Sequence, residues 1–335
     1  MRRDHSIATG TVHRLHIDSR VLADNFLGDA PRRIVDVYVP AGHDGRGLPL
    51  LVDLVGYTGG GPAHTNWKGL GESAPERLDR LIASGAMLPA VVAFPDCFTR
   101  LGGNQYVNSA VMGRWEDFLI DEMLPAVEQQ FACGGTGRRG VFGKSSGGFG
   151  AMWHVLKRSD IWSAAACHSG DMAFDIVYLP DVYPALMTLE KHGGIEGFMR
   201  YFEAAKKPSD DDIHALMMLA MGATYDPAPD QYLGLRLPVD LDTGELIAER
   251  WHNWLAFDPV RLVDSHIDAL KGLKGLYIDC GTLDQYNMIF GHRQLRNKLT
   301  AAGVPHRYEE FVDNHSSIDY RMDISLPFLA QALDR

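Results

Sequence analysis

The chain has 335 residues, a formal net charge of −11 and a hydrophobic fraction of 46%. This composition is typical of a soluble globular enzyme, and the acidic balance argues against nucleic acid or an anionic membrane as the main partner. No apolar run approaches the ~18 residues of a membrane span, and no apolar core of a signal peptide follows the N-terminal Met-Arg-Arg-Asp-His-Ser. The four cysteines have no metal-binding or disulfide-type spacing. We therefore expect a cytoplasmic protein with free thiols.

Short apolar segments alternate with helical patterns along much of the chain. Alternating residues in the first two segments predict an antiparallel hairpin, and continuous apolar runs in the later ones predict strands buried on both faces. The expected strands are residues 11–17, 33–39, 48–55, 88–94, 140–142, 161–167, 275–280 and 306–311. The expected helices are residues 74–83, 115–131 (with a break at Pro125), 149–157, 213–221 and 291–302. This alternation predicts a mostly parallel, doubly wound α/β sheet.

The alternation is interrupted between residues 172 and 257, a stretch rich in Met, Tyr, Leu and Trp. Ser209 precedes three aspartates, which favours the capped start of a helix over a metal site. Asp242-Thr243-Gly244 favours a hairpin turn over a calcium loop, because the other ligands of such a loop are missing. We expect a helical cap, residues 172–257, between two parts of the core, residues 1–171 and 258–335. Apolar surface on such a cap is compatible with a homodimer.

The most informative segment is Gly143-Lys144-Ser145-Ser146-Gly147, which has an expected strand before it and an expected helix after it. Strand, sharp turn and helix are the context of a nucleophile elbow, in which the central serine is held above the edge of the sheet. Its glycines are needed because a Cβ at Gly143 or Gly147 would collide with the adjoining strand or helix. The spacing predicts Ser145, and not Ser146, as the nucleophile.

A serine nucleophile needs a general base, and the base needs an orienting acid. In folds with this elbow the acid and the histidine follow the serine in chain order, each on a loop after a strand. Asp284 and His315 occupy such loops, so we predict Asp284 as the orienting acid and His315 as the general base. Three other aspartates fit less well. Asp279 lies within a strand, Asp313 is too close to His315 in sequence to face its ring, and Asp258 precedes a proline as a helix cap does.

Two backbone N–H groups are expected to form the oxyanion hole. One belongs to Ser146, and the other to Tyr57 in the glycine-rich loop after residues 48–55. The expected substrate contacts are Thr58, Asn104, Tyr106, Lys144 and His168. Asp171 is close to the elbow, and like His168 it is open to either a substrate contact or a structural role. Asp53, inside an apolar run, needs a partner that the sequence does not identify.

Five segments together resemble a known family. They are Tyr106–Ser109 with Trp115–Phe118, Glu122–Pro125, the elbow Gly143–Gly148, Asp279–Asp284 and Asn314–Ser316. They are similar to the putative esterase family of α/β-hydrolases, which includes S-formylglutathione hydrolases, enterochelin-esterase-like and feruloyl-esterase-like enzymes. The resemblance covers about residues 10–170 and 258–333 and is weaker in the cap. It implies an α/β-hydrolase fold and the hydrolysis of carboxylic esters without a cofactor or a metal ion.

The residues and the resemblance together predict a serine carboxylesterase acting on a small-molecule ester. One alternative is an acyltransferase in which an alcohol intercepts the same acyl-enzyme. Another is a thioesterase of the S-formylglutathione hydrolase type, but this chain lacks the cysteine that typically follows the oxyanion loop there, after Gly56-Tyr57-Thr58. A binding protein without activity is a third alternative, which an intact set of Ser145, Asp284 and His315 argues against. The sequence does not identify the acyl or the alcohol group of the substrate.

Overall fold

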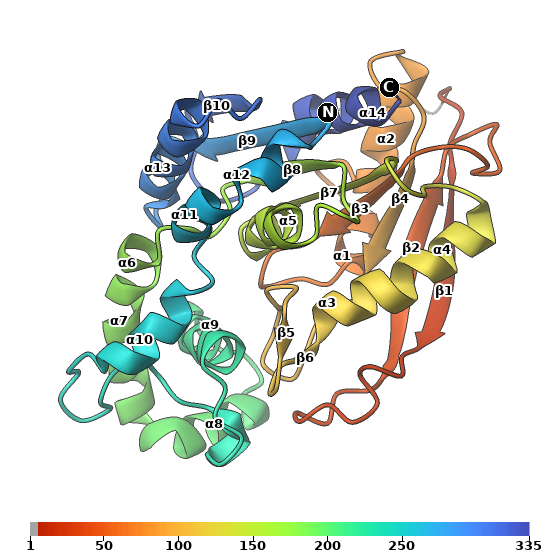
Figure 1. Ribbon diagram of the computed structural model, residues 1–335. Helices are drawn as coiled ribbons and strands as arrows, with labels where there is room; N and C mark the ends of the chain where they lie inside the picture. Colours follow the sequence, from red (N-terminus) through yellow and green to blue (C-terminus); the bar gives the residue numbers. More distant parts are fainter. Residues whose placement is uncertain (1–5, 335) are drawn as a thin grey trace.

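The computed structural model describes residues 6–334, and its main feature is one eight-stranded sheet with the strand order β1-β2-β4-β3-β7-β8-β9-β10 (Figure 1). The strands are β1 (Thr11–Asp18), β2 (Arg32–Val39), β3 (Leu50–Leu54), β4 (Val91–Pro95), β7 (Arg139–Lys144), β8 (Ala164–His168), β9 (Gly275–Gly281) and β10 (Arg307–Phe311). β2 pairs antiparallel with both β1 and β4, and all other neighbours are parallel. The start of the chain, on which the signal-peptide expectation rests, lies outside the described residues.

The predicted α/β sheet is therefore confirmed, including the antiparallel hairpin at its start. Each expected strand is present, and the differences are shifts of a few residues at the ends. A small antiparallel pair, β5 (Asn108–Ser109) and β6 (Gly113–Arg114), was not expected, because two residues are too few to give a pattern. Pro125 begins a new helical segment, as expected, since a π-helical segment (Phe118–Met123) precedes it.

The helices divide between the two faces of the sheet and a separate group. They are α1 (Pro62–Thr65), α2 (Ala74–Ala83), α3 (Trp115–Asp117), α4 (Leu124–Phe131), α5 (Ser146–Lys157), α6 (Phe174–Val177), α7 (Leu179–Lys191), α8 (Gly194–Ala204), α9 (Asp210–Tyr225), α10 (Ala248–Leu255), α11 (Pro259–Leu262), α12 (Ile267–Lys271), α13 (Met288–Ala301) and α14 (Met322–Leu333). One face of the sheet packs against α4, α5 and α13, and the other packs against α2 and α14. Each face thus buries its own apolar layer, which explains why the parallel strands read as continuous apolar runs.

A third apolar cluster joins the helices between β8 and β9 to the core, since it also contains Phe149 of α5 and Met288 and Ile289 of α13. α7, α8, α9 and α10 gather to one side of the sheet (Figure 1), and their apolar side chains pack with one another. Ser209 caps α9 by accepting a hydrogen bond from the N–H of Asp212, as expected from the sequence. Residues 242–244 turn between Val239 and Leu246, which form an antiparallel bridge. The boundaries 1–171, 172–257 and 258–335 and the role of this group as a cap stay predictions.

Candidate active site

Ser145 lies at the turn between β7 and α5 in a strained backbone conformation, with φ 57° and ψ −125°. A non-glycine residue holds such a conformation only when its surroundings impose it, and such strain is concentrated at functional sites. The neighbouring glycines allow the turn to form, as predicted. A Cβ on Gly143 would lie 2.2 Å from the carbonyl oxygen of Leu54, and a Cβ on Gly147 would lie 1.6 Å from the same atom. The side chain of Ser145 therefore stands at the carboxyl edge of the sheet.

His315 and Asp284 form a hydrogen-bonded pair at the same edge. His315 Nδ1 lies 2.8 Å from Asp284 Oδ2, and both side chains are largely buried. Although burial acts in the opposite direction, the hydrogen bond and charge of His315 hold the pKa of Asp284 below its ordinary value. The backbone N–H of His315 donates to Gln285, and Tyr286 lies edge-on to the imidazole at 5.0 Å. These contacts hold the imidazole ring in place, and Nε2 is the ring nitrogen that does not face Asp284.

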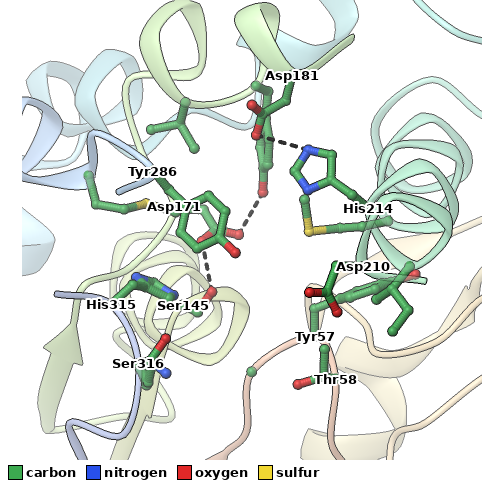
Figure 2. A pocket seen from close by; sticks show the side chains of 17 residues that line it. Tyr57, Thr58, Ser145, Asp171, Asp181, Asp210, His214, Tyr286, His315 and Ser316 are labelled. Carbon is green, nitrogen blue, oxygen red and sulfur yellow. Dashed lines mark hydrogen bonds and ion pairs between the residues drawn. The ribbon is translucent and has the colours of Figure 1, made fainter. Parts of the chain in front are cut away.

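The hydroxyl of Ser145 points toward a second carboxylate, that of Asp171. Ser145 Oγ lies 3.5 Å from Asp171 Oδ1 (Figure 2). Within residues 6–334, no hydrogen bond joins Ser145 Oγ to His315. Serine–histidine contacts are often long in enzymes without substrate, so this geometry is compatible with a catalytic pair. Burial raises the pKa of Asp171 above its ordinary value, and the Tyr178 hydroxyl and His315 partly offset this effect.

The loop expected to supply the oxyanion hole runs beside Ser145. A Cβ on Gly56 would lie 3.6 Å from the Cβ of Ser145, which shows how closely the loop approaches. Tyr57 follows, with its side chain buried and its hydroxyl donating to the carbonyl of Leu101. In the described part of the chain, neither the N–H of Tyr57 nor that of Ser146 donates to another protein group. Both N–H groups are therefore free to bind a developing oxyanion.

These groups open on one cavity of about 370 Å³ between the sheet edge and the helices α7 and α9 (Figure 2). Ser145, His315, Asp171, Tyr57, Thr58 and Lys144 line its floor and sides. Asp181 of α7 and His214 of α9 line the wall contributed by those helices, where His214 Nε2 lies 3.2 Å from Asp181 Oδ2, and Asp210 lines the cavity as well. Burial lowers the pKa of Lys144, and Asp319 and Asp284 act in the opposite direction. The cavity thus combines a serine, an oriented imidazole and an excess of carboxylates.

Three expected substrate contacts do not line this cavity. Asn104 and Tyr106 are buried and shape their own loop: the Asn104 amide donates to the carbonyl of Cys97, and the Tyr106 hydroxyl donates to the carbonyl of Val55. The ring of His168 is also buried, with Nδ1 2.7 Å from Asp279. Polar residues in a loop next to an active site can serve the backbone as well as a ligand, and the sequence alone does not distinguish these roles.

His168 belongs to a second Ser-His-Asp arrangement inside the protein. Its Nε2 lies 2.9 Å from the hydroxyl of Ser325, and Nδ1 faces Asp279, which also accepts a hydrogen bond from Arg321. Ser325 is completely buried, and no substrate can reach it. This network ties α14 to the sheet, and it shows that the residue types of a triad have chemical meaning only where a cavity reaches them.

Two further features could not be read from the sequence. Asp53 pairs with His64, whose Nδ1 lies 2.5 Å from its carboxylate, so the buried acid has the partner that it required. Tyr178 and Gln105 donate to Asp171. The short spacing of Tyr178 and Asp171 in the sequence gave no signal, because the contact depends on how the chain turns after β8.

Asp258 caps α11, as expected, and also binds two N–H groups at the start of α6.

Among residues 6–334, no group of three or more His, Cys, Asp or Glu side chains is placed to hold a metal ion. Within that range no helix has both the length and the apolar character needed to cross a membrane. The four cysteines are free and buried.

Solved structures similar to this chain share its fold. A ferulic acid esterase has a TM-score of 0.63 at 18% identity, with 97% of this chain and 99% of that chain covered. The Staphylococcus aureus fluorophosphonate-binding serine hydrolase F has a TM-score of 0.59 at 14% identity, with 96% and 99% covered. An S-formylglutathione hydrolase from Agrobacterium tumefaciens has a TM-score of 0.58 at 19% identity, with 97% and 96% covered. At these identities the likeness establishes the α/β-hydrolase fold and no more.

Sequence comparisons identify the family. Esterase Rv1288 and Esterase MT1326, from two strains of Mycobacterium tuberculosis, are each 23% identical to this chain over 241 residues, or 68% of it. The chain spans less than half of these relatives, since the matched part is 42% of their length. The model of the family described as "Putative esterase" matches residues 31–326, and the chain therefore belongs to this esterase family.

Proposed function

We propose that this protein is a serine carboxylesterase that hydrolyses small-molecule esters. The observation that carries the proposal is the meeting of three features at one cavity: the strained turn at Ser145, the pair formed by His315 and Asp284, and the unoccupied N–H groups of Tyr57 and Ser146. Family membership and the fold support it independently. Each feature alone has a structural explanation, but their convergence does not.

Acylation would begin when Ser145 Oγ attacks the carbonyl carbon of the ester. His315 Nε2 would take the hydroxyl proton, because Nδ1 faces Asp284. The N–H groups of Tyr57 and Ser146 would bind the negative charge that develops on the carbonyl oxygen, aided by the positive end of the α5 dipole. The imidazolium would then protonate the leaving alcohol, and an acyl group would remain on Ser145.

Deacylation would reverse these roles with water in place of the alcohol. His315 would take a proton from water, the resulting hydroxide would attack the acyl carbon, and the same N–H groups would bind the second oxyanion. Collapse of the intermediate would return the proton to Ser145 and release the carboxylic acid. Every proton is transferred through His315, so the chemistry needs neither a cofactor nor a metal ion.

The test compares two serines of the same chain. Ser145→Ala is expected to reduce kcat for p-nitrophenyl acetate or butyrate by at least about three orders of magnitude. Ser325→Ala is the matched control, because Ser325 also bonds to a histidine paired with an aspartate but has no access to substrate. It is expected to keep the activity of the unaltered protein. Circular dichroism and the unfolding midpoint would establish that both variants fold.

A covalent probe gives a second measurement. A fluorophosphonate is expected to add its mass to the peptide that contains Ser145 and not to the one that contains Ser325. Normal turnover by a folded Ser145→Ala variant would contradict the proposal. Labelling at another serine with Ser145 unmodified would also contradict it.

A further inference from the structure

The carboxylate of Asp171 is buried, yet its Oδ1 faces Ser145 and accepts only one long hydrogen bond. Asp171 is only 3% exposed and lines the cavity. Its Oδ2 accepts hydrogen bonds from the hydroxyl of Tyr178 at 2.6 Å, from Ser146 Oγ at 3.4 Å and from Gln105 Nε2 at 3.5 Å. Its Oδ1 has one contact, the hydroxyl of Ser145 at 3.5 Å. The carboxylate is held through one oxygen, and the other remains available.

Buried aspartates of this chain differ in how they use their two oxygens. In the described part of the chain, Asp53 Oδ1 and Asp226 Oδ2 have no hydrogen-bond partner, but neither residue lines the cavity as Asp171 does. Asp258 accepts from the N–H groups of Ala173 and Val260 through Oδ1 and from that of Phe174 through Oδ2. Asp279 pairs with His168 through one oxygen and with Arg321 through the other. The half-satisfied state of Asp171 is costly for a buried group, and burial accordingly raises its pKa. A hydrogen-bond donor on a ligand would supply the missing partner.

The position of this oxygen relative to Ser145 specifies which part of an ester it would meet. Once the carbonyl carbon bonds to Ser145 Oγ, three other substituents surround that carbon. The oxyanion would face the N–H groups of Tyr57 and Ser146, and the leaving alcohol would face His315. Figure 2 shows Tyr57, His315 and Asp171 on three different sides of Ser145. The remaining direction, toward Asp171, is the one left for the acyl group.

The distance between Asp171 and Ser145 determines which atom of the acyl group can contact Asp171. Asp171 Oδ1 lies 3.5 Å from Ser145 Oγ, so a donor within hydrogen-bond reach of it would be only one or two bonds from the carbonyl carbon. We propose that Asp171 makes the enzyme selective for esters whose acyl group carries a hydrogen-bond donor, a hydroxyl or an ammonium group, on the carbon next to the carbonyl. This inference rests on the proposed esterase function.

The charges around the cavity agree with this assignment. Three carboxylates, those of Asp171, Asp181 and Asp210, line the cavity against one lysine, Lys144, and Asp181 contacts His214. An acyl group that presents a donor or a positive charge gains from these carboxylates, whereas an acidic substituent would be repelled. The two kinds of donor are chemically distinct, and the substrates of the test separate them.

The experiment compares ethyl esters that differ in one substituent at that carbon. Propionate carries hydrogen, lactate carries a hydroxyl, alanine carries an ammonium group, and 2-fluoropropionate carries an electron-withdrawing atom that cannot donate. We expect kcat/KM for lactate or alanine to exceed that for 2-fluoropropionate by at least about tenfold, the size expected for a hydrogen bond to a charged group. Rates are normalised to hydroxide-catalysed hydrolysis, so that the intrinsic reactivity of each ester is removed. A larger gain for alanine than for lactate would identify the ammonium group as the preferred donor.

Two variants test whether Asp171 is the cause of the preference. Asp171→Asn keeps the shape of the side chain but replaces its charge, and it is expected to reduce the ratio of lactate to 2-fluoropropionate turnover toward one. Tyr178→Phe removes the hydroxyl that anchors Oδ2 and is expected to reduce the same ratio, so the test remains available if Asp171→Asn does not fold. Asp211→Asn is the control, since it removes an exposed carboxylate of α9 that does not line the cavity, and the ratio should persist.

The outcomes separate this inference from the function on which it rests. If no ester in the series is hydrolysed and Ser145 takes up no fluorophosphonate, the esterase proposal itself fails. If the esters are hydrolysed but propionate and 2-fluoropropionate match lactate and alanine, the role of Asp171 is refuted and the esterase proposal stands. A preference that survives unchanged in both Asp171→Asn and Tyr178→Phe would also refute it.

Discussion

His315 is the side chain on which the proposed chemistry depends, because it must move protons between Ser145, the leaving alcohol and water. Asp284 is the carboxylate that contacts its ring, at 2.8 Å. Asp313, two residues before His315, is occupied elsewhere: it accepts hydrogen bonds from the N–H of Asn314 and from the hydroxyl of Tyr320. The two aspartates therefore differ in role although both lie close to the histidine in sequence or in space.

This difference gives a prediction for a pair of variants. Asp284→Asn is expected to lower kcat on the order of a thousandfold or more, because an amide at that position no longer stabilises the imidazolium. Asp313→Asn is the matched control and is expected to change kcat less than about threefold, because its carboxylate bonds to Asn314 and Tyr320 and not to the ring of His315. Steady-state kinetics on one p-nitrophenyl ester checks both. A larger loss from Asp313→Asn than from Asp284→Asn would reverse the assignment.

The helices α7 and α9 contribute a wall of the cavity, and their charges bear on which esters enter it. Asp181 lies on α7 and Asp210 at the start of α9, and both line the cavity. Both are at least partly exposed, so their effect on a ligand is screened by salt. The S-formylglutathione hydrolase alternative requires a substrate with carboxylates, which this wall would repel.

We therefore predict that neutralising the wall changes selectivity by charge. The double variant Asp181→Asn/Asp210→Asn is expected to raise the ratio of kcat/KM for p-nitrophenyl hemisuccinate to that for p-nitrophenyl butyrate severalfold at low ionic strength. The gain should shrink at 0.5 M salt, since the Debye length then falls to roughly 4 Å. Asp211→Asn serves as the control, because Asp211 is an exposed neighbour of Asp210 that does not line the cavity. An unchanged ratio in the double variant would show that the wall does not act on the substrate.

At the scale of helices and strands, the sequence predicts some features of this protein well and others poorly. The order of strands and helices follows from apolar runs and helical spacing, and the elbow follows from glycines whose Cβ atoms would collide with the backbone at Leu54. The contact between Asp284 and His315 was expected from chain order alone. Asn104, Tyr106 and His168 were expected at the substrate and are buried instead, because the partner of a polar loop residue depends on tertiary packing. The contacts of Asp171 with Ser145 and Tyr178 are set by that packing in the same way.

Across the whole molecule, two buried histidines make folding sensitive to mild acid. His154 in α5 and His292 in α13 are fully buried, and burial lowers the pKa of each to about 4. The hydrogen bonds of His154 require a neutral imidazole. Nε2 lies 3.0 Å from the carbonyl of Tyr106, and Nδ1 accepts a hydrogen bond from the indole of Trp162. Protonation of Nδ1 would break that second bond and place a charge in the apolar core.

The sign of the effect follows from comparing the two states. In the unfolded chain a histidine has a pKa of about 6.5, so below that pH the unfolded state binds protons that the folded state does not. The free energy of unfolding should therefore fall as the pH falls from about 6.5 to about 4, by up to about 1.4 kcal/mol per pH unit for each histidine. Asp279 and Asp284, whose pKa values are lowered in the folded protein, add their own loss only below about pH 4, near the ordinary range of an aspartate.

Urea unfolding between pH 4.5 and 8 measures this dependence. His64 and Asp171, whose pKa values are raised in the folded protein, act in the opposite direction, so the test compares slopes. His154→Gln, although less stable at pH 8, should lose stability below pH 6.5 with a slope smaller than that of the unaltered protein by the equivalent of one proton. His43→Gln is the matched control, because that imidazole is exposed, and its slope should equal that of the unaltered protein. Equal slopes in all three proteins would mean that His154 takes up a proton in the folded state without cost, which its bond to Trp162 and its complete burial argue against.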